Sequence, residues 1–385
     1  MKPLKVTFVI TGLHVGGAEI MLLKLLSGLS RSRFTPSVVT LSASGELSGE
    51  LPRMDVPLYS LGLTPGRWSP GAFVRLVRYL RDSAPDILQG WMYHGNLAAQ
   101  AAAQFMRPRP PVVWNIRGTV TDLATESLST AATIWLGAKL SRFAAVVVNN
   151  SHVSARLHRQ HLGYSTRNVV VIANGFDTSL YRPDSVARAE FRRALSVDDE
   201  DFLIGHVGRL HPMKDHETLL RAAETCISAE LRARFVLVGA DVSGRSQMLL
   251  DTAERAGIGA QVKYLGPRTD IARIMPGLDL FTLTSSYGEG FPNAVGEAMA
   301  CGVPCAVTDV GDSAHLVGES GTVVAPGDAA GLAEAWLRVM RLPAAERARL
   351  GTCARQRIME HFSLTAIVQQ YEELYDRVAR QQGRA

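Results

Sequence analysis

Short apolar runs alternate with amphipathic stretches along the whole chain, and runs of this length suit buried strands. The runs in the first half are Val6–Ile10, Val38–Leu41, Ile87–Leu88, Val112–Ile116, Ala144–Val148 and Val169–Ile172. Those in the second half are Phe202–Val207, Phe235–Val238, Val262–Leu265, Leu280–Leu283, Cys305–Thr308 and Gly321–Val324. Between them, helical spacing predicts helices such as Ala18–Leu29, Pro70–Ser83 with Ser69 as N-cap, and Asp215–Thr225. The alternation is typical of βαβ units and predicts an α/β fold with two doubly wound, Rossmann-like domains.

The length of the chain also favours two domains. It has 385 residues, and single cores rarely keep growing past ~250–300 residues. Strand signals lapse after Asp177, where charged and turn residues take over. We therefore expect an N-terminal domain over 1–177, a linker over 178–200 and a C-terminal domain over 201–361. The final stretch, 362–385, predicts an amphipathic helix from Leu364 to Arg380 that returns to the N-terminal domain.

No segment has the pattern of a secretion signal or a membrane span. The first apolar run, Val6–Ile10, has five residues, fewer than the ~7–15 of a signal sequence. The longest candidate span, Ala131–Val148, is interrupted by Lys139 and Arg142, whereas a spanning helix needs ~18 apolar residues. We expect a cytoplasmic protein whose contact with the inner face of the cytoplasmic membrane is peripheral.

Charge is distributed unevenly over a composition that is otherwise ordinary for a soluble globular protein, with 46% hydrophobic and 20% charged residues. Residues 1–177 hold 18 Lys and Arg against 9 Asp and Glu, and residues 178–385 hold 23 against 27. The basic half indicates an anionic membrane, a phosphorylated lipid or a nucleic acid as partner, or else serves solubility alone. The four cysteines are too few for a disulfide framework, so we expect buried thiols at Cys226, Cys301, Cys305 and Cys353.

The segment from Ser285 to Gly302 carries the strongest chemical signal. A buried strand ends in a Gly-rich loop, and Pro292 suits the first turn of the helix that follows. Loop amides and the positive end of that helix form a ready anion site. Glu289 in the loop and Glu297 about one turn into the helix suit sugar hydroxyls better than phosphate. Taken alone, this pair is equally well explained by a capped loop and a solvent-facing glutamate.

The whole run closely resembles the E-x7-E signature of the retaining glycosyltransferases of family 4, whose GT-B fold has two Rossmann-like domains facing across a cleft. The blocks Glu-Gly-Phe-Pro-Asn and Glu-Ala-Met-Ala-Cys-Gly are intact, beginning at Glu289 and Glu297. The resemblance implies that Glu289 contacts hydroxyls of the donor sugar and that Glu297 binds the nucleotide ribose. It also implies that backbone amides hold the sugar and diphosphate at Gly290, Phe291, Pro292 and Asn293.

Two further loops are similar to blocks of the same family. In the segment His206–His216, the resemblance implies that Arg209 and Lys214 clamp the diphosphate, which gains negative charge as the glycosidic bond breaks. The segment Gly12–Glu19 is not Gly-x-Gly-x-x-Gly, and no acidic residue ends the second predicted strand, so a nicotinamide enzyme is disfavoured. It resembles the family's first loop instead, where backbone amides approach the donor phosphate at Gly16 and Gly17.

Weaker candidates lie at four other predicted strand ends. His94, in a segment similar to the family's His-containing loop, is either a packed histidine or a contact to the sugar near its reacting carbon. Arg117 is either an acceptor-side or phosphate contact, or a member of a structural ion pair. The resemblance further implies a hinge at Asn174 and Gly175 and a base-binding site at Leu265 and Arg268.

These features predict a retaining glycosyltransferase that moves a sugar from a nucleotide diphosphate sugar, expected to be a UDP-sugar, to a lipid-linked or cell-surface glycan acceptor with an α-linkage. The donor is a co-substrate, and no cofactor, metal or nucleic acid is expected. Loops at Tyr287-Gly288 and 240–244 depart from common family forms, which leaves donor specificity open. Two alternatives remain: a GT-B sugar-nucleotide epimerase or phosphorylase, and a non-catalytic carbohydrate-binding or scaffolding relative.

Overall fold

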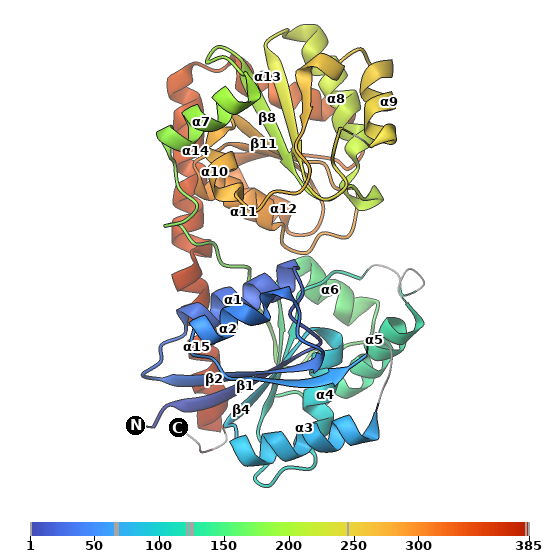
Figure 1. Ribbon diagram of the computed structural model, residues 1–385, viewed down its shortest axis with the longest axis vertical. Coiled ribbons are helices and arrows are strands. Elements are labelled where there is room, and N and C mark those ends of the chain that lie inside the picture. The colour runs from blue at the N-terminus through green and yellow to red at the C-terminus, as the bar shows by residue number, and fades with distance from the viewer. Residues whose placement is uncertain are drawn as a thin grey trace. The chain divides into compact units, whose positions relative to one another are not determined.

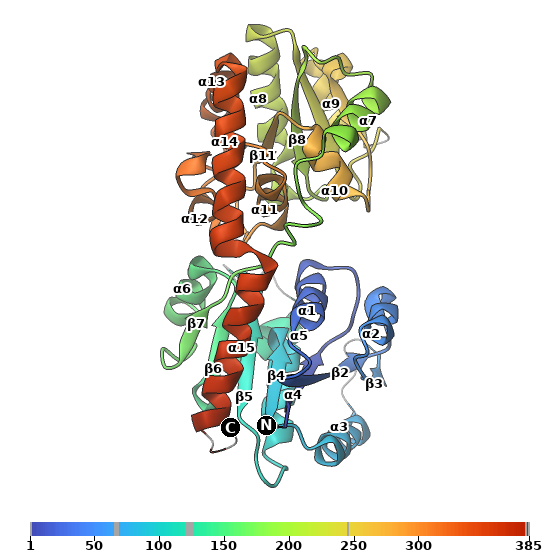
Figure 2. The same cartoon turned by 90° about the vertical axis from the view of Figure 1, so that its left-hand side faces the viewer.

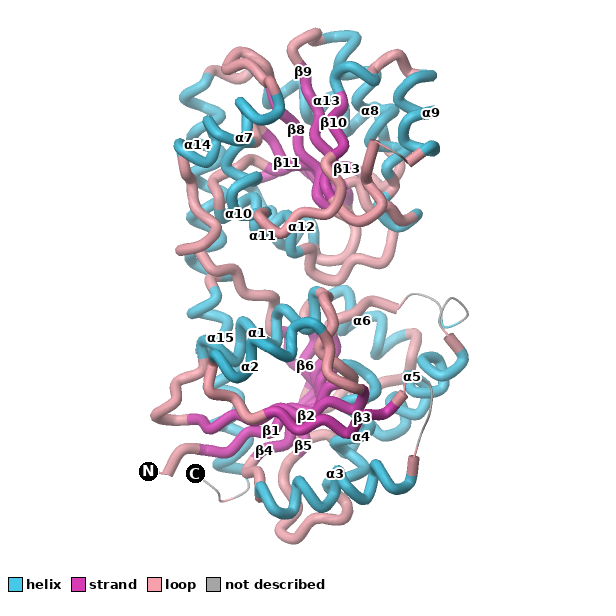
Figure 3. Tube along the Cα trace, in the orientation of Figure 1, coloured by secondary structure: helices cyan, strands magenta, loops and turns pink. Residues whose placement is uncertain are grey.

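The chain forms two compact units, each with its own parallel sheet. The computed structural model describes residues 2–385 apart from 65–68, 121, 122, 124–126, 245, 382, 384 and 385. The first unit comprises Met1–Gly175 together with Leu364–Ala385, and the second comprises Phe176–Ser363. Strands occupy the interior of each unit and helices lie outside them (Figure 3).

The first unit is built on a seven-stranded sheet of order β3-β2-β1-β4-β5-β6-β7. Three of these strands, β1, β2 and β4, are labelled in Figure 1. Its strands are β1 (Leu4–Ile10), β2 (Phe34–Ser42), β3 (Leu58–Leu63), β4 (Ile87–Trp91), β5 (Val112–Ile116), β6 (Val146–Asn149) and β7 (Val169–Val171). The order of strands reverses between β1 and β4, which pair from Val6–Ile87 to Ile10–Trp91. Loops that leave the carboxyl ends of strands at such a switch point diverge and leave room for a ligand.

Helices cover both faces of this sheet. They are α1 (Gly17–Gly28), α2 (Glu50–Arg53), α3 (Pro70–Ser83), α4 (Met92–Ala103), α5 (Leu128–Leu140), α6 (His152–Gln160) and α15 (Leu364–Gln381). Helices α1 and α15 share one apolar core with Phe8 and Trp91, and α3, α4 and α5 share another with Val9 and Trp114. Figure 2 shows α15 lying along the first unit, where its apolar stripe is buried at Ile367, Tyr371, Leu374, Tyr375 and Val378.

The second unit has a six-stranded parallel sheet of order β10-β9-β8-β11-β12-β13. Its strands are β8 (Phe202–Val207), β9 (Ala233–Val238), β10 (Val262–Tyr264), β11 (Leu280–Leu283), β12 (Cys305–Thr308) and β13 (Gly321–Val324). Its helices are α7 (Ser185–Leu195), α8 (His216–Ala229), α9 (Gln247–Arg255), α10 (Ile271–Ile274), α11 (Asn293–Ala300), α12 (Ser313–Val317), α13 (Ala329–Arg341) and α14 (Ala344–Arg357), followed by a π-helical turn, Ile358–Phe362. Here the strand order reverses between β8 and β11, as it does between β1 and β4.

Two doubly wound α/β sheets were predicted from the sequence, and both are present. The capping prediction for α3 is confirmed, because the Ser69 side chain accepts a hydrogen bond from the Ala72 amide. Strand β3 was not predicted. It is an edge strand in which only Leu61 is buried, and Gly62 interrupts its pattern, so its sequence carries no apolar run.

The segment 178–200, expected to be a linker, contains helix α7, which belongs to the second unit. Its arginines suggested exposed chain, but two of them bind one carboxylate. Arg188 and Arg192 donate to the two oxygens of Asp279 at 2.6 and 2.9 Å, and Arg192 is buried. The charged sequence therefore anchors α7 to the second unit.

Two other sequence expectations concern membrane spans and thiols. Within the described part of the chain, no helix is both long enough and apolar enough to cross a bilayer. All four cysteines are free thiols, and three are buried. The prediction of a buried thiol is wrong for Cys353, which is exposed on α14.

Candidate functional site

The strongest candidate residues of the second unit lie in the loops that follow its two central strands. The loop after β8 contains Arg209 and a short 3₁₀ turn, Pro212–Lys214, and the loop after β11 contains Glu289. Two hydrogen bonds tie these loops together. The Ser286 amide donates to the Met213 carbonyl at 2.9 Å, and the Thr284 hydroxyl donates to the Lys214 carbonyl at 2.7 Å. Pairing of β8 with β11 thus brings residues 75 positions apart to the same edge of the sheet.

Lys214 and Glu289 form an ion pair at this edge. The Lys214 ammonium lies 2.5 Å from Glu289 Oε1, and both side chains are largely buried, with 15% and 10% of their surface exposed. The Ser285 hydroxyl donates to the same carboxylate oxygen at 2.6 Å. Arg209 is exposed and makes no ion pair or hydrogen bond with the described residues. The edge therefore offers a fixed carboxylate, a paired ammonium and an uncommitted guanidinium.

Two glycines with positive φ angles allow the backbone around Glu289 to take its shape. Gly288 has a φ of 76°, and a Cβ there would lie 2.6 Å from Met213 Sδ. Gly311 has a φ of 61°, and a Cβ there would lie 2.4 Å from the Glu289 carbonyl. The Asp312 amide donates to the Gly290 carbonyl at 2.8 Å. Side chains at these positions would push the Glu289 backbone away from its place beside Lys214.

Glu297 lies in α11 and has a partner that the sequence did not reveal. Burial, followed by the charge of Glu297 and a hydrogen bond to it, raises the pKa of the Tyr181 hydroxyl. Tyr181 therefore stays protonated and orients this carboxylate. Gly296, its neighbour, touches Phe176, because a Cβ at Gly296 would lie 2.0 Å from that ring. Only the tertiary structure brings the segment around residue 180 to this helix.

The other residues expected around the donor sugar belong to the same turn. Pro292 is the N-cap residue of α11, which begins at Asn293. The Phe291 side chain is 5% exposed and packs between Phe176 and Phe362, with ring centroids 6.2 and 5.3 Å apart. Phe291 thus fixes the turn from inside the unit, and contacts of the Gly290 to Asn293 backbone to sugar and diphosphate stay a prediction.

The residues expected to bind the base lie after β10. The Leu265 amide donates to the Leu237 carbonyl at 3.0 Å, which continues the sheet by one residue. The exposed Arg268 side chain forms a two-pronged contact with Asp270 at 2.7 and 2.5 Å. A role for Arg268 in binding a base stays a prediction. A base bound there would meet the Arg268 guanidinium while it is paired with Asp270.

In the first unit, the glycine-rich loop after β1 leads directly into α1. Gly16 is the N-cap residue and Gly17 the first residue of α1. A Cβ on Gly16 would lie 2.4 Å from Glu19 Oε2, so the acidic side chain lies against the start of its own helix. Burial raises the pKa of Glu19. A carboxylate in the first turn is stabilised by the helix dipole, and it occupies space that an anion would otherwise share.

The family resemblance implied that His94 lies in a loop. In the structure it lies in the first turn of α4. Residues Gln89–Trp91 complete β4, and the chain turns at once into the helix through Met92, whose φ is 63°. Gly95 lets the helix approach β1 closely, since a Cβ there would lie 2.2 Å from the Val9 carbonyl. The abrupt turn places His94 at the switch point between β1 and β4. Burial lowers the pKa of its imidazole, which favours the neutral form.

Arg117, after β5, is a buried cation held by neutral partners. It donates to the Tyr371 hydroxyl at 2.9 Å and to Asn174 Oδ1, and its guanidinium lies 5.2 Å from the Trp91 ring centroid. The described residues give it no carboxylate partner, so the alternative of a structural ion pair is not found, and the acceptor-side or phosphate contact stays a prediction. Gly175 follows Asn174 and packs against Leu364 at the start of α15. Arg117 therefore connects the end of β5 to the segment predicted as a hinge.

Two histidines near Lys214 are buried in an environment that favours their neutral form. His206 and His216 are buried, with ring centroids 4.9 Å apart. Burial, assisted by the charge of Lys214, lowers the pKa of both, that of His216 to about 4. Among the residues that the structure describes, no group of three or more His, Cys, Asp and Glu side chains could hold a metal ion.

Two doubly wound units with polar residues gathered at their switch points define the class of α/β proteins that bind ligands at the carboxyl edges of their strands. Comparison with family models gives the particular family. The model described as Glycosyltransferase Family 4 matches residues 15–180, and the model described as Glycosyl transferases group 1 matches residues 201–341. Together these matches span most of the chain, which belongs to the family 4 type of glycosyltransferases and has the GT-B fold.

Individual relatives align with part of the chain. The D-inositol 3-phosphate glycosyltransferases of Rhodococcus erythropolis and Rhodococcus opacus are 34% and 32% identical over 46% and 57% of this chain. The putative glycosyltransferase EpsF of Bacillus subtilis is 32% identical over 37% of this chain. These alignments cover 42%, 50% and 36% of the relatives themselves, so the chain spans about half the length of the curated relatives it matches, or less.

Solved structures match over almost the whole length. Anabaena HepE in complex with UDP has a TM-score of 0.84 and 24% identity, over 97% of this chain and all of that one. The same protein with UDP and glucose has a TM-score of 0.80 and 25% identity, over 97% and 99%. Sucrose-phosphate synthase of Thermosynechococcus elongatus has a TM-score of 0.79 and 18% identity, over 98% and 100%. These matches establish the fold.

Proposed function

We propose that this protein is a retaining glycosyltransferase that transfers a sugar from a nucleotide diphosphate sugar to an acceptor hydroxyl. The observation that carries the proposal is the pairing of Lys214 with Glu289 beside the exposed Arg209, at the carboxyl ends of β8 and β11. A carboxylate fixed by a lysine and a serine suits sugar hydroxyls, and the adjacent cations suit a diphosphate.

A UDP-sugar is the proposed donor. HepE, 25% identical to this chain, was solved with UDP and glucose. In this chain Glu289 would orient the sugar, Arg209 and Lys214 would hold the diphosphate, and Glu297, oriented by Tyr181, would bind the ribose. Gly16, Gly17 and His94 of the first unit are proposed to complete the contacts to phosphate and sugar.

The proposed reaction needs no nucleophile from the protein. The bond between the anomeric carbon and the diphosphate oxygen breaks, and its electron pair leaves with the diphosphate. The acceptor oxygen then bonds to that carbon from the same face, which gives the α-linkage, and its proton passes to the departing phosphate. Arg209 and Lys214 stabilise the charge that develops on the leaving group, so the proposed reaction is independent of metal.

The proposed acceptor is a lipid-linked or cell-surface glycan, reached by peripheral contact with the inner face of the cytoplasmic membrane. The excess of positive charge in residues 1–177 supports this proposal, since anionic lipid surfaces attract exposed Lys and Arg. Lipopolysaccharide and other polysaccharides are the proposed classes of product.

Ligand binding and donor turnover together test this proposal. A thermal-shift panel with UDP, GDP and ADP should single out UDP, because a ligand at about 100 times its Kd stabilises the folded state by ~2.7 kcal/mol. The protein should also release UDP slowly from a UDP-sugar in water. Binding of UDP without any release would favour a carbohydrate-binding relative, and interconversion of UDP-sugars would favour an epimerase.

A further inference from the structure

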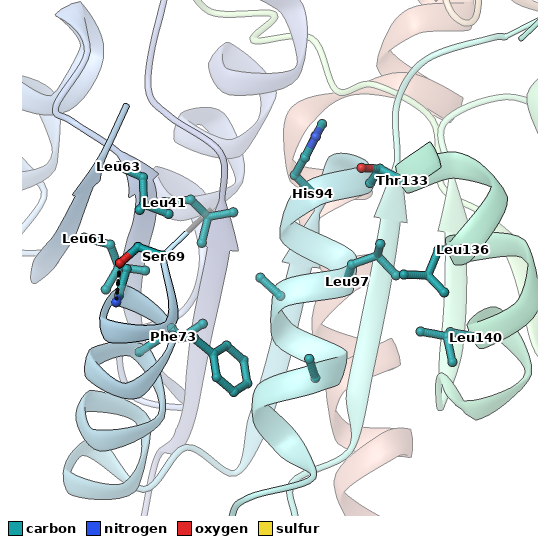
Figure 4. Close-up of a pocket in the computed structure, with 14 residues that line it drawn as sticks. Leu41, Leu61, Leu63, Ser69, Phe73, His94, Leu97, Thr133, Leu136 and Leu140 are labelled. Carbon is teal, nitrogen blue, oxygen red and sulfur yellow. Dashed lines mark hydrogen bonds between the residues drawn. The ribbon is translucent and has the colours of Figure 1, made fainter. Parts of the chain in front are cut away.

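A cavity in the first unit lies between α3, α4 and α5, beside strands β2 and β3 (Figure 4). Its volume is about 420 Å³, within the range of sites that hold small molecules. Among the fourteen described residues that line it, eleven are apolar, and the other three are Ser69, His94 and Thr133. A cavity of this kind excludes sugars and phosphates from most of its length, because they would lose hydrogen bonds to water without replacement.

Two of the polar side chains of the cavity, His94 and Thr133, lie together at one end of it. Figure 4 shows His94 and Thr133 at one end, with Phe73 and Leu140 further along. The Ser69 hydroxyl caps α3, and the Thr133 hydroxyl donates to the Ser129 carbonyl at 2.7 Å. His94 makes no hydrogen bond with the described residues. The ligand that fits has a hydrogen-bonding group at His94 and a hydrocarbon body beyond it.

The outer face of α5 indicates where such a ligand comes from. Leu136 and Leu140 line the cavity, and Leu136, Trp135 and Leu128 are also exposed, by 43%, 59% and 90%. The Lys139 ammonium lies 5.9 Å from the Trp135 ring centroid, and residues 127–145 contain no Asp or Glu. An apolar face with an aromatic side chain and cations complements the boundary between the headgroups and acyl chains of an anionic bilayer.

We propose that this cavity binds the hydrocarbon chain of a lipid-linked acceptor, with the hydroxyl-bearing head of the acceptor at His94. The inference rests on the proposed function and deepens it, because it assigns the apolar part of the acceptor to a defined place. Acceptors that lack a chain would lose most of their binding, since each buried methylene contributes to affinity.

The test compares two probes that share a sugar head, n-octyl β-D-glucoside below its micelle concentration and methyl β-D-glucoside. Calorimetry or ligand-observed NMR on the full chain should show binding at least about tenfold tighter for the octyl compound. Ala98→Phe and the smaller Ala101→Leu, both on α4, fill the cavity and should reduce octyl binding to the level of methyl binding. Ala348→Phe, an exposed alanine of α14, is the matched control and should bind like the wild type.

Equal binding of the two probes to the wild type would overturn the inference, as would unchanged octyl binding in both filled variants. A stable dimer in light scattering that both filled variants dissociate would also overturn it, because a second copy would then occupy the cavity. The UDP thermal shift, measured on the same samples, separates this failure from failure of the proposed function. A filled variant that keeps the UDP shift and loses octyl binding supports the inference.

Discussion

The second unit presents a partly buried ion pair between Lys214 and Glu289, whereas the first presents a neutral histidine and a glycine-rich backbone. Both sets of residues lie where the strand order of a doubly wound sheet reverses. In the second unit, Lys214 and Glu289 are already paired with protein atoms before a ligand arrives, and Arg209 is exposed. In the first unit, the one buried cation, Arg117, is committed to Asn174 and Tyr371 among the described residues. We infer from this comparison that the second unit contributes charged groups to the proposed site, whereas the first contributes neutral groups and close backbone contacts.

Among these changes, neutralising Glu289 should reduce turnover the most. Glu289→Gln keeps the shape of the side chain but removes its charge, and kcat should fall by about 10²–10³, on the order of 3–4 kcal/mol. UDP binding should change little. Steady-state kinetics with Glu224→Gln, an exposed glutamate of α8, as control would test this. Turnover near that of the control would break the proposed division between the units.

Removing the imidazole of His94 tests the first unit. His94→Ala should lower kcat by roughly 10-fold to 100-fold, the loss of one or two hydrogen bonds, while the Kd of UDP stays the same. Because burial lowers the pKa of the His94 imidazole from its ordinary value, the neutral form should persist to a lower pH than in a free histidine, and any loss of rate through its protonation should begin only at that lower pH. The control is His161→Ala, at an exposed site. A weakened UDP complex would contradict the separation of roles.

Removing the ammonium of Lys214 should act on binding as well as on turnover. Lys214→Ala deletes the proposed contact to the diphosphate and leaves Glu289 without its cation, so the Kd of UDP should rise by about 10-fold to 30-fold. Calorimetric titration with UDP measures this, with Lys263→Ala on the exposed side of β10 as control. An unchanged Kd would show that Lys214 serves only to position Glu289.

The contacts of Arg117 can be tested through two tyrosines of α15. Tyr371→Phe removes the oxygen that accepts from Arg117 and Asn115 and should lower the free energy of unfolding by about 1–2 kcal/mol. Tyr375→Phe is the matched control, because the Tyr375 hydroxyl is buried and has no hydrogen-bond partner among the described residues, and it should leave the free energy of unfolding unchanged. Urea denaturation compares the two, and equal stabilities would contradict the structural role of the network.

Chelation of metal ions should have the smallest effect. If Arg209 and Lys214 are sufficient to stabilise the leaving diphosphate, activity should be the same with and without EDTA. A loss of more than about tenfold that Mg²⁺ restores would show that the second unit relies on a metal in addition to its own cations.

The sequence predicted the bounds of the buried strands well. Five strands have the expected bounds: Val112–Ile116, Phe202–Val207, Leu280–Leu283, Cys305–Thr308 and Gly321–Val324. The first four are buried almost throughout, since strands covered on both faces are continuous apolar runs, whereas the fifth is a partly exposed edge strand. Strand β3 and helix α7 escaped prediction. The first is partly exposed, and the second is anchored by Arg188 and the buried Arg192, within a charged sequence that resembles an exposed linker.

The candidate site also has a part that the sequence predicted and a part that it did not. A local motif is visible in sequence because its spacing follows from one strand, one loop and one helix, as with Glu289 and Glu297. The partners of these residues are not visible, because Lys214 and Tyr181 reach them from other parts of the chain. The expected loop around His94 is a strand end and a helix turn, since the positive φ of Met92 depends on the packing of α4 against β1.

The sequence by itself determined that two βαβ-rich units form and where the motifs proposed to bind phosphate and sugar lie, because periodicity and loop chemistry are local. The tertiary structure decided which side chains hold those motifs in place: Ser285 and Lys214 on Glu289, Tyr181 on Glu297, and Tyr371 on Arg117. It also decided that an apolar cavity extends from His94. Contacts of this kind depend on which strands become neighbours in a sheet, and burial of apolar surface over each whole unit selects that order.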